Sequence, residues 1–312
     1  MSFAIGVLGV VGLLVAFPDN TETAFTKMVE QPLLTVVGLA MMTAAIALNA
    51  WRWASIVGQI TGAKTKSVLL RASKLLYKAS LIGTVIPLPI LMDAVRVQQS
   101  RDCFGGSLEL ASISVFLDRL YGAASLVILA TGAWLTWAGG VPNLVIGVIA
   151  ASAIWCTLIL IGGIYPVSIT TEAHTTANAD GKAHIVWDFL RRVTEAVVAE
   201  SKRPAPFLLR TTLSLLIHLL QVTILALLVL EFTSFAISWD QVFAGYIVAT
   251  GASMASITPG GLAVSEMGFA GVLAFLAGVS DPSSIATLAL SYLVFRVIRI
   301  LSTLPGVHFW MQ

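Results

Sequence analysis

Charged side chains interrupt apolar segments of this sequence at positions where membrane helices normally carry none. Asp93 and Arg96 follow two prolines, Pro87 and Pro89, in an otherwise apolar run, and Glu266 follows a second break later in the chain. Ionisable groups are costly at membrane depth, so they usually bind a substrate, an ion or one another. Their chemistry is charge recognition, in which a guanidinium holds phosphate oxygens and a carboxylate holds a cation or neutralises an arginine.

The two breaks follow the same pattern. The second contains three helix-breaking residues, namely Pro259, Gly260 and Gly261. Glu266 lies seven residues after its proline, and Asp93 lies six residues after Pro87. Non-helical backbone of this kind is tolerated at membrane depth only when it is buried in protein or lines a wet cavity.

Each break is followed by an apolar helix that contains an arginine. Arg119, next to Asp118, comes 26 residues after Asp93, and Arg296 comes 30 residues after Glu266. A further arginine, Arg299, lies three residues beyond Arg296 and shares its helix face. The matched spacing favours a substrate site, and the alternative is that the acids neutralise the arginines as buried structural pairs.

Composition places these residues in a membrane protein. Of the 312 residues, 57% are hydrophobic and 11% are charged, and the mean hydropathy is +0.92. Soluble domains average roughly 45–50% apolar and 25% charged residues. The apolar segments are continuous rather than alternating, which predicts an all-α, polytopic helical bundle with about six to eight membrane helices. The polar loop at about residues 170–206 is too short for a soluble catalytic domain of ordinary size.

Several segments have the length and polarity of membrane spans. They are Ser2–Phe17, Leu33–Trp51, Leu108–Trp137, Asn143–Tyr165, Phe207–Leu230 and Ile285–Leu304. The second ends in Trp51-Arg52-Trp53, which we interpret as an interfacial anchor. His218 and Gln221 share one helix face in the Phe207–Leu230 span, and this spacing predicts hydrogen bonds to a neighbouring helix.

Basic residues predict the topology. One stretch contains five basic residues and no acidic one, namely Lys64, Lys66, Arg71, Lys74 and Lys78. Because loops rich in Lys and Arg stay on the cytoplasmic side, we expect this stretch in the cytoplasm. From Ser67 to Leu81 the bases recur at helical spacing, as in an amphipathic helix on an anionic leaflet or an ordinary loop helix. The polar loop at 170–206 is also expected inside, as are both termini.

The two breaks then read as hairpins that enter the membrane from opposite sides. Leu81–Val95 is predicted to be re-entrant from the cytoplasm, and Val242–Val279 from outside, with two short complete spans as the alternative for the latter. The whole chain, residues 1–312, would form one membrane domain with half-repeats at about 67–137 and 242–305. Interrupted segments at corresponding positions of an inverted repeat indicate a substrate site near the midplane.

Other chemistry finds little support in the sequence. His174 and His184 flank a polar run, but no other ligand type clusters with them, and Cys103 and Cys156 are isolated. We therefore expect no metal, no cofactor and no nucleic-acid partner.

These motifs resemble a known family. Those that carry the resemblance are Leu81-Ile-Gly83, Pro87, Asp93-Ala-Val-Arg96, Ser114-Val-Phe-Leu-Asp118-Arg119, Pro259-Gly-Gly-Leu-Ala-Val-Ser-Glu266, Ala50-Trp-Arg-Trp53 and Phe295-Arg296. Together they look like the flippase-like membrane domain of lysylphosphatidylglycerol synthases, over nearly the whole chain. The resemblance implies a helical bundle with re-entrant hairpins that moves a lipid between leaflets. Two departures are Pro89-Ile-Leu-Met92, where glycines are usual, and the lack of the soluble aminoacyl-transferase domain.

We therefore expect a lipid translocase or lipid-transport accessory of a bacterial or archaeal cytoplasmic membrane, and not an enzyme. Its lipid partners would have an anionic or glycosylated headgroup. Its protein partner would be a second copy of the chain or an envelope-biosynthesis protein. The alternatives are a membrane-embedded transferase on a lipid-linked sugar, with Asp93 or Glu266 as its base, and a non-catalytic subunit of an envelope-biosynthesis complex.

Overall fold

A computed structural model of the chain describes most of its residues. The described residues are 11, 14–85, 89–137, 151, 154, 191–200, 202–255 and 262–310. Several predictions lie outside them, namely those on Pro87, Pro259, Gly260, Gly261, most of the Ser2–Phe17 and 143–165 spans, and the two histidines of the polar loop.

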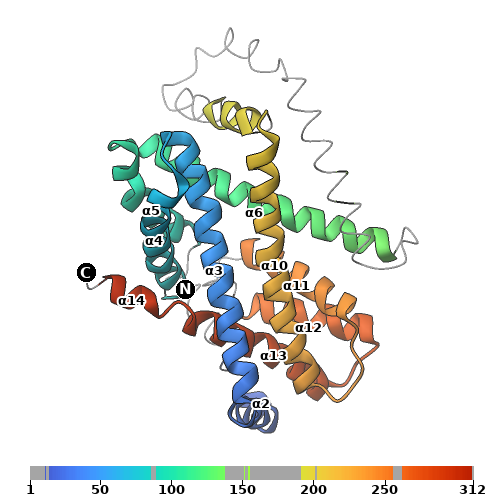
Figure 1. Cartoon of the computed structure of the whole chain (residues 1–312). Coiled ribbons are helices and arrows are strands. Elements are labelled where there is room, and N and C mark those ends of the chain that lie inside the picture. Colours follow the sequence, from blue (N-terminus) through green and yellow to red (C-terminus); the bar gives the residue numbers. More distant parts are fainter. Residues whose placement is uncertain are drawn as a thin grey trace, which may run out of the picture. The chain divides into compact units, whose positions relative to one another are not determined.

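The described residues form helices and contain no strand (Figure 1). The labelled helices are α2 (Pro18–Glu30), α3 (Pro32–Thr61), α4 (Thr65–Val85), α5 (Pro89–Ser100), α6 (Leu108–Trp137), α10 (Pro204–Phe232), α11 (Trp239–Ala255), α12 (Val264–Ala277), α13 (Pro282–Leu301) and α14 (Pro305–Trp310), with a 3-10 turn at Arg101–Phe104. Residues 191–200 are also helical. The predicted all-α helical bundle is confirmed.

Four helical segments in the described part of the chain are long and apolar enough to cross a membrane. They are Pro32–Thr61, Leu108–Thr136, Pro204–Phe232 and Pro282–Phe309. Their 28 to 30 residues correspond to about 42–45 Å of helix, enough for the hydrocarbon core and the headgroup layers. Each coincides with a span predicted from hydropathy.

Both predicted hairpins contain a helix that ends and another that begins. The predicted amphipathic segment and the first hairpin arm form one continuous helix, α4, and Pro89 begins α5. Proline suits this first helical position because its missing N–H has no intrahelical partner there. In the second hairpin, α11 ends at Ala255 and α12 begins at Val264. Entry from opposite sides of the membrane stays a prediction.

The chain divides into two compact units that interleave along the sequence. The first unit comprises Met1–Ala50, Leu69–Arg96 and Leu216–Gln312, and the second comprises Trp51–Val68 and Val97–Leu215. Helices α3, α4, α5 and α10 each contribute to both units. The single-domain organisation and the two half-repeats stay predictions.

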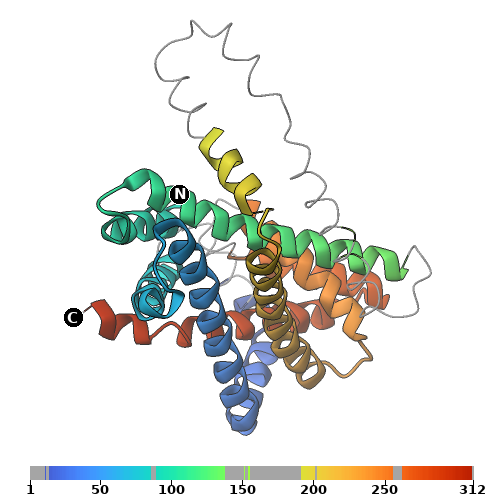
Figure 2. The ribbon, with the colours of Figure 1, turned by 45° about the horizontal axis from the view of Figure 1, so that its top comes forward.

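In the first unit, α12 packs against both α11 and α13, and these helices lie side by side in both views (Figures 1 and 2). Gly245 on α11 is needed for this packing. A Cβ atom there would overlap Leu273 Cδ1 and lie 2.9 Å from Phe269 Cδ2, so a larger residue would push α12 away. Glycine allows the two hairpin arms to approach closely.

The second unit has its own apolar core. Its buried members come from α3, α6, residues 191–200 and α10, and are Ile56, Ile113, Leu117, Tyr121, Val193 and Phe207. This core brings together the parts of α3, α6 and α10 that carry Arg52, Asp118 and Arg210.

Candidate functional site

The central feature of the first unit is an ion pair between α12 and α13. Arg296 Nε lies 2.7 Å from Glu266 Oε1. The Glu266 side chain is 1% exposed and that of Arg296 is 14% exposed. The structure therefore places the predicted acid and arginine together, with the acid fully covered and the guanidinium still partly accessible.

Local sequence explains where these two side chains lie. Glu266 is in the first turn of α12, where the positive end of the helix dipole favours an acid. Ala263, which precedes this turn, has φ +68°, a strained conformation for a residue with a Cβ atom. Arg296 lies 14 residues into α13, about 21 Å along the helix, near the middle of the candidate span Pro282–Phe309.

Arg299 lies one helical turn beyond Arg296 and is exposed. Spacing of i, i+3 places both on one face of α13. With one acid and two arginines, these three side chains carry a net charge of +1. They could therefore attract an anion, because a guanidinium fork matches the geometry of phosphate oxygens.

A hydrogen-bonded chain links α10 to α11 in the same unit. The Tyr246 hydroxyl donates to Gln221 Oε1 at 2.6 Å, and His218 Nδ1 lies 2.7 Å from the same hydroxyl. Because the phenol has one proton and gives it to Gln221, His218 Nδ1–H is the donor to the phenol oxygen. The predicted hydrogen bonds of His218 and Gln221 to a neighbouring helix are confirmed.

The acid and the base on α5 lie near each other, at a long distance for an ion pair. Arg96 Nη1 lies 3.8 Å from Asp93 Oδ1 on the same helix. Arg96 is 1% exposed, whereas a quarter of the Asp93 side chain is accessible. Asp93 therefore combines a nearby arginine with access from outside, and its role as a site residue stays a prediction.

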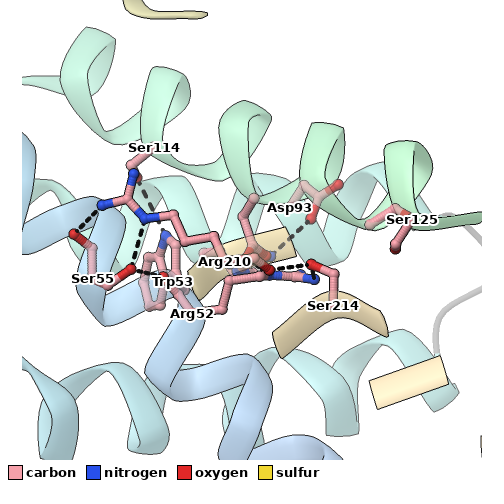
Figure 3. A network of polar contacts seen from close by, with 11 residues as sticks. Arg52, Trp53, Ser55, Asp93, Ser114, Ser125, Arg210 and Ser214 are labelled. Carbon is pink, nitrogen blue, oxygen red and sulfur yellow. Dashed lines mark hydrogen bonds and ion pairs between the residues drawn. The ribbon is translucent and has the colours of Figure 1, made fainter. Parts of the chain in front are cut away.

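In the second unit, Arg52 is buried and does not lie at an exposed interface. Its Nε lies 2.8 Å from Asp118 Oδ1. Its Nη1 donates to Ser214 Oγ at 2.7 Å (Figure 3). The interpretation of Arg52 as an interfacial anchor is wrong, because this acid on α6 draws it inward. Asp118 is 1% exposed and pairs with Arg52, and Arg119 is half-buried. A substrate contact at these two residues stays a prediction.

A second buried cluster in this unit was missed by the sequence analysis. Arg210 pairs with Glu200 and donates to Ser55 Oγ at 2.8 Å and to Gln59 Oε1 at 3.0 Å. Glu200 also accepts from the Tyr121 hydroxyl at 2.8 Å. A single arginine near the start of the apolar Pro204–Phe232 span was the available signal.

The two units therefore use their charges differently. In the second, Arg52 and Arg210 are each matched by a buried carboxylate and by further hydrogen bonds, so the cluster is neutral and suited to holding helices together. In the first, the Arg296 site keeps an excess positive charge. Among the residues described, no group of three His, Cys, Asp or Glu side chains could hold a metal ion.

These features define an α-helical, multi-pass membrane protein with paired charges inside its membrane helices. The chain belongs to the family described as Lysylphosphatidylglycerol synthase TM region, whose family model matches residues 3–306. No curated protein and no solved structure shows a significant match to it. Membership of this family connects the protein with membrane lipids.

Proposed function

We propose that the protein moves an anionic phospholipid or a lipid-linked glycan between the two leaflets of a membrane. The observation that carries this proposal is the Glu266–Arg296 pair, because it puts a partly accessible guanidinium near the middle of a candidate span. A phosphate crossing the hydrocarbon core must replace its hydration shell, and charged groups at that depth provide the replacement.

Arg296 and Arg299 hold the phosphate in this mechanism. A guanidinium has five N–H donors in a fixed fork, so Arg296 can contact Glu266 and a phosphate at the same time. Glu266 balances the Arg296 charge while the site is empty, which lowers the cost of keeping the arginine in an apolar helix. The acyl or prenyl chains stay in the bilayer while the headgroup passes.

The break between α11 and α12 supports passage of a polar group. Broken helices at membrane depth occur where the backbone lines a cavity or is covered by protein. Movement of the α11–α12 hairpin against α13 would open the Arg296 site alternately to each side, as in transporters built from interrupted repeats. Asp93 on α5, with its accessible carboxylate, would contact a cationic part of a headgroup.

We further propose that the protein performs no covalent chemistry and lies in the cytoplasmic membrane with both termini inside. The run from Lys64 to Lys78 contains five bases and no acid, which supports a cytoplasmic position for the start of α4.

The test is lipid movement in vesicles that contain only the purified protein. The variant Arg296→Lys keeps a positive charge but loses the bidentate fork, so we expect the initial rate to fall at least about tenfold, equivalent to about 1.4 kcal/mol. Arg296→Ala should abolish movement. The matched control is Arg191→Ala, because Arg191 is an exposed arginine that pairs with Glu195.

Two results would refute the proposal. One is wild-type protein that moves no labelled lipid of any headgroup class in these vesicles. The other is an Arg296→Ala protein that is folded, by circular dichroism and gel filtration, and moves lipid as fast as the Arg191→Ala control.

A further inference from the structure

Helix α2 carries a polar stripe on one face. Asp19, Thr23 and Lys27 recur at i, i+4 and i+8, which puts them on one face of this 13-residue helix. All three line a single cavity in the first unit. The Lys27 ammonium is held in place by donating to the Glu231 carbonyl oxygen at 2.6 Å.

The opposite wall of the cavity comes from the N-terminal half of α13. Ser283, Thr287 and Leu290 recur at i, i+4 and i+7 and so lie on one face of that helix. Phe232, the last residue of α10, completes the lining. The cavity has a volume of about 240 Å³. Two packed helices therefore face each other with polar stripes across a space that their own side chains leave unfilled.

The cavity lies at one end of a candidate membrane span. Ser283 and Thr287 are in the first two turns of α13, which begins the candidate span Pro282–Phe309. The ends of a membrane span lie at the level of the lipid headgroups. Asp19 and Thr23 are exposed and Lys27 is half-buried, so the polar stripe of α2 is accessible at that level.

We propose that this cavity binds the headgroup of a zwitterionic phospholipid, one that carries both a phosphate and an ammonium group. Lys27 and the hydroxyls of Ser283 and Thr287 contact the phosphate, and the Asp19 carboxylate contacts the ammonium. Lys27 and Asp19 are separated by about 12 Å along the helix axis, so they bind opposite ends of a headgroup.

Size and charge both favour this class of ligand. Pockets for whole drug-sized ligands measure roughly 300–1,000 Å³, so about 240 Å³ suits a headgroup whose acyl chains remain in the bilayer. A purely anionic headgroup would meet Asp19 without a compensating charge, and a purely cationic one would meet Lys27. The inference is independent of transport, because binding at this cavity does not require passage through the Arg296 site.

Lipid binding to the purified full chain in detergent tests the proposal, with phosphatidylethanolamine and phosphatidylglycerol of identical acyl chains as probes and native mass spectrometry as readout. We expect phosphatidylethanolamine to bind at least about fivefold more tightly, since one added charge-assisted hydrogen bond at a partly exposed site has about that effect. Asp19→Asn should reverse or abolish this preference, because it removes the partner of the ammonium.

Variants of Lys27 separate loss of binding from loss of structure. Lys27→Gln should weaken both lipids, whereas Lys27→Arg keeps the charge and should restore binding. The matched control is Glu22→Gln, which removes a charge from α2 at an exposed position that does not line the cavity.

Equal binding of the two lipids by the wild-type chain would overturn the proposal. An unchanged preference for phosphatidylethanolamine in Asp19→Asn would also overturn it, as would a loss of lipid binding in Glu22→Gln equal to the loss in Lys27→Gln. If the protein moves lipid between leaflets but does not prefer phosphatidylethanolamine, the binding site at the cavity is rejected and the proposed transport is not. If it prefers phosphatidylethanolamine but moves no lipid, the proposed transport is rejected and the binding site is not.

Discussion

Replacing Arg296 by methionine should destabilise the protein more than replacing Glu266 by glutamine. The two charged atoms are 2.7 Å apart, and Coulomb's law with an effective dielectric constant of about 20 gives an attraction of about 6 kcal/mol. The cost of desolvating both groups opposes this attraction, so the pair itself adds little to stability. Removing one partner is different, because the other then stays buried with its charge uncompensated.

The exposed fractions set the order of the two effects. Glu266 is 1% exposed and Arg296 is 14% exposed, so the acid has less access to water when it loses its partner. We expect Arg296→Met to lower the free energy of unfolding by about 3–5 kcal/mol, the range found for broken buried pairs. Glu266→Gln should cost about 1–3 kcal/mol, because the amide still contacts the guanidinium.

The assay is reversible unfolding in mixed micelles, followed by circular dichroism, for the two single variants and the double variant. Arg296→Met combined with Glu266→Gln should be more stable than Arg296→Met alone, by about 2 kcal/mol or more, because no buried charge remains. Additive losses in the double variant, or single losses below about 1 kcal/mol, would refute the reasoning about this pair.

Three further predictions concern packing, the second unit and pH. Gly245→Ala should lower the melting temperature of the purified protein by several degrees, since its Cβ would overlap the facing helix α12, whereas Gly251→Ala, with open space at that position, should not. Arg210→Met should cost about 3–5 kcal/mol in an unfolding titration, and adding Glu200→Gln should recover most of the loss. The hydrogen bond from the Ser284 N–H holds the pKa of Asp281 below its usual 3.8, so this helix cap stabilises α13 at neutral pH. The stabilisation is lost as the pH falls below that value. Asp281→Ala should therefore melt at a lower temperature than the wild type at pH 7, and the difference between the two melting temperatures should shrink in strong acid.

The membrane helices could be predicted because their signal is local. Long apolar runs such as Leu108–Trp137 show their helical state and approximate ends in composition alone. Glycine and proline likewise mark the two breaks. The pairing of His218 and Gln221 with another helix followed from their shared face, although the partner, Tyr246, did not.

Charge pairing between distant segments could be predicted only in part. Glu266 and Arg296 were brought together by the matched spacing of two breaks, whereas Glu200 and Arg210 belong to no repeated pattern. Arg52 was misread because an arginine between two tryptophans has the composition of an interface, and the buried acid that pairs with it lies 66 residues away. Burial of a charged side chain depends on tertiary contacts, which hydropathy does not record.

The cavity between α2 and α13 shows the same limit. The amphipathic pattern of α2 is visible in the sequence, but which face points toward the protein depends on packing against α13.

The central claim is that Arg296 holds the phosphate of a lipid inside the membrane. The most direct measurement is the contact between lipid phosphorus and arginine side-chain nitrogen, recorded by solid-state NMR on ¹⁵N-arginine-labelled protein in lipid bilayers. A short contact between lipid phosphorus and the side-chain nitrogens assigned to Arg296 should be present in the wild type and in Arg191→Ala, and should be missing in Arg296→Lys, where the contact of Arg299 remains. A spectrum of Arg296→Lys with the same contacts as the wild type would contradict the account.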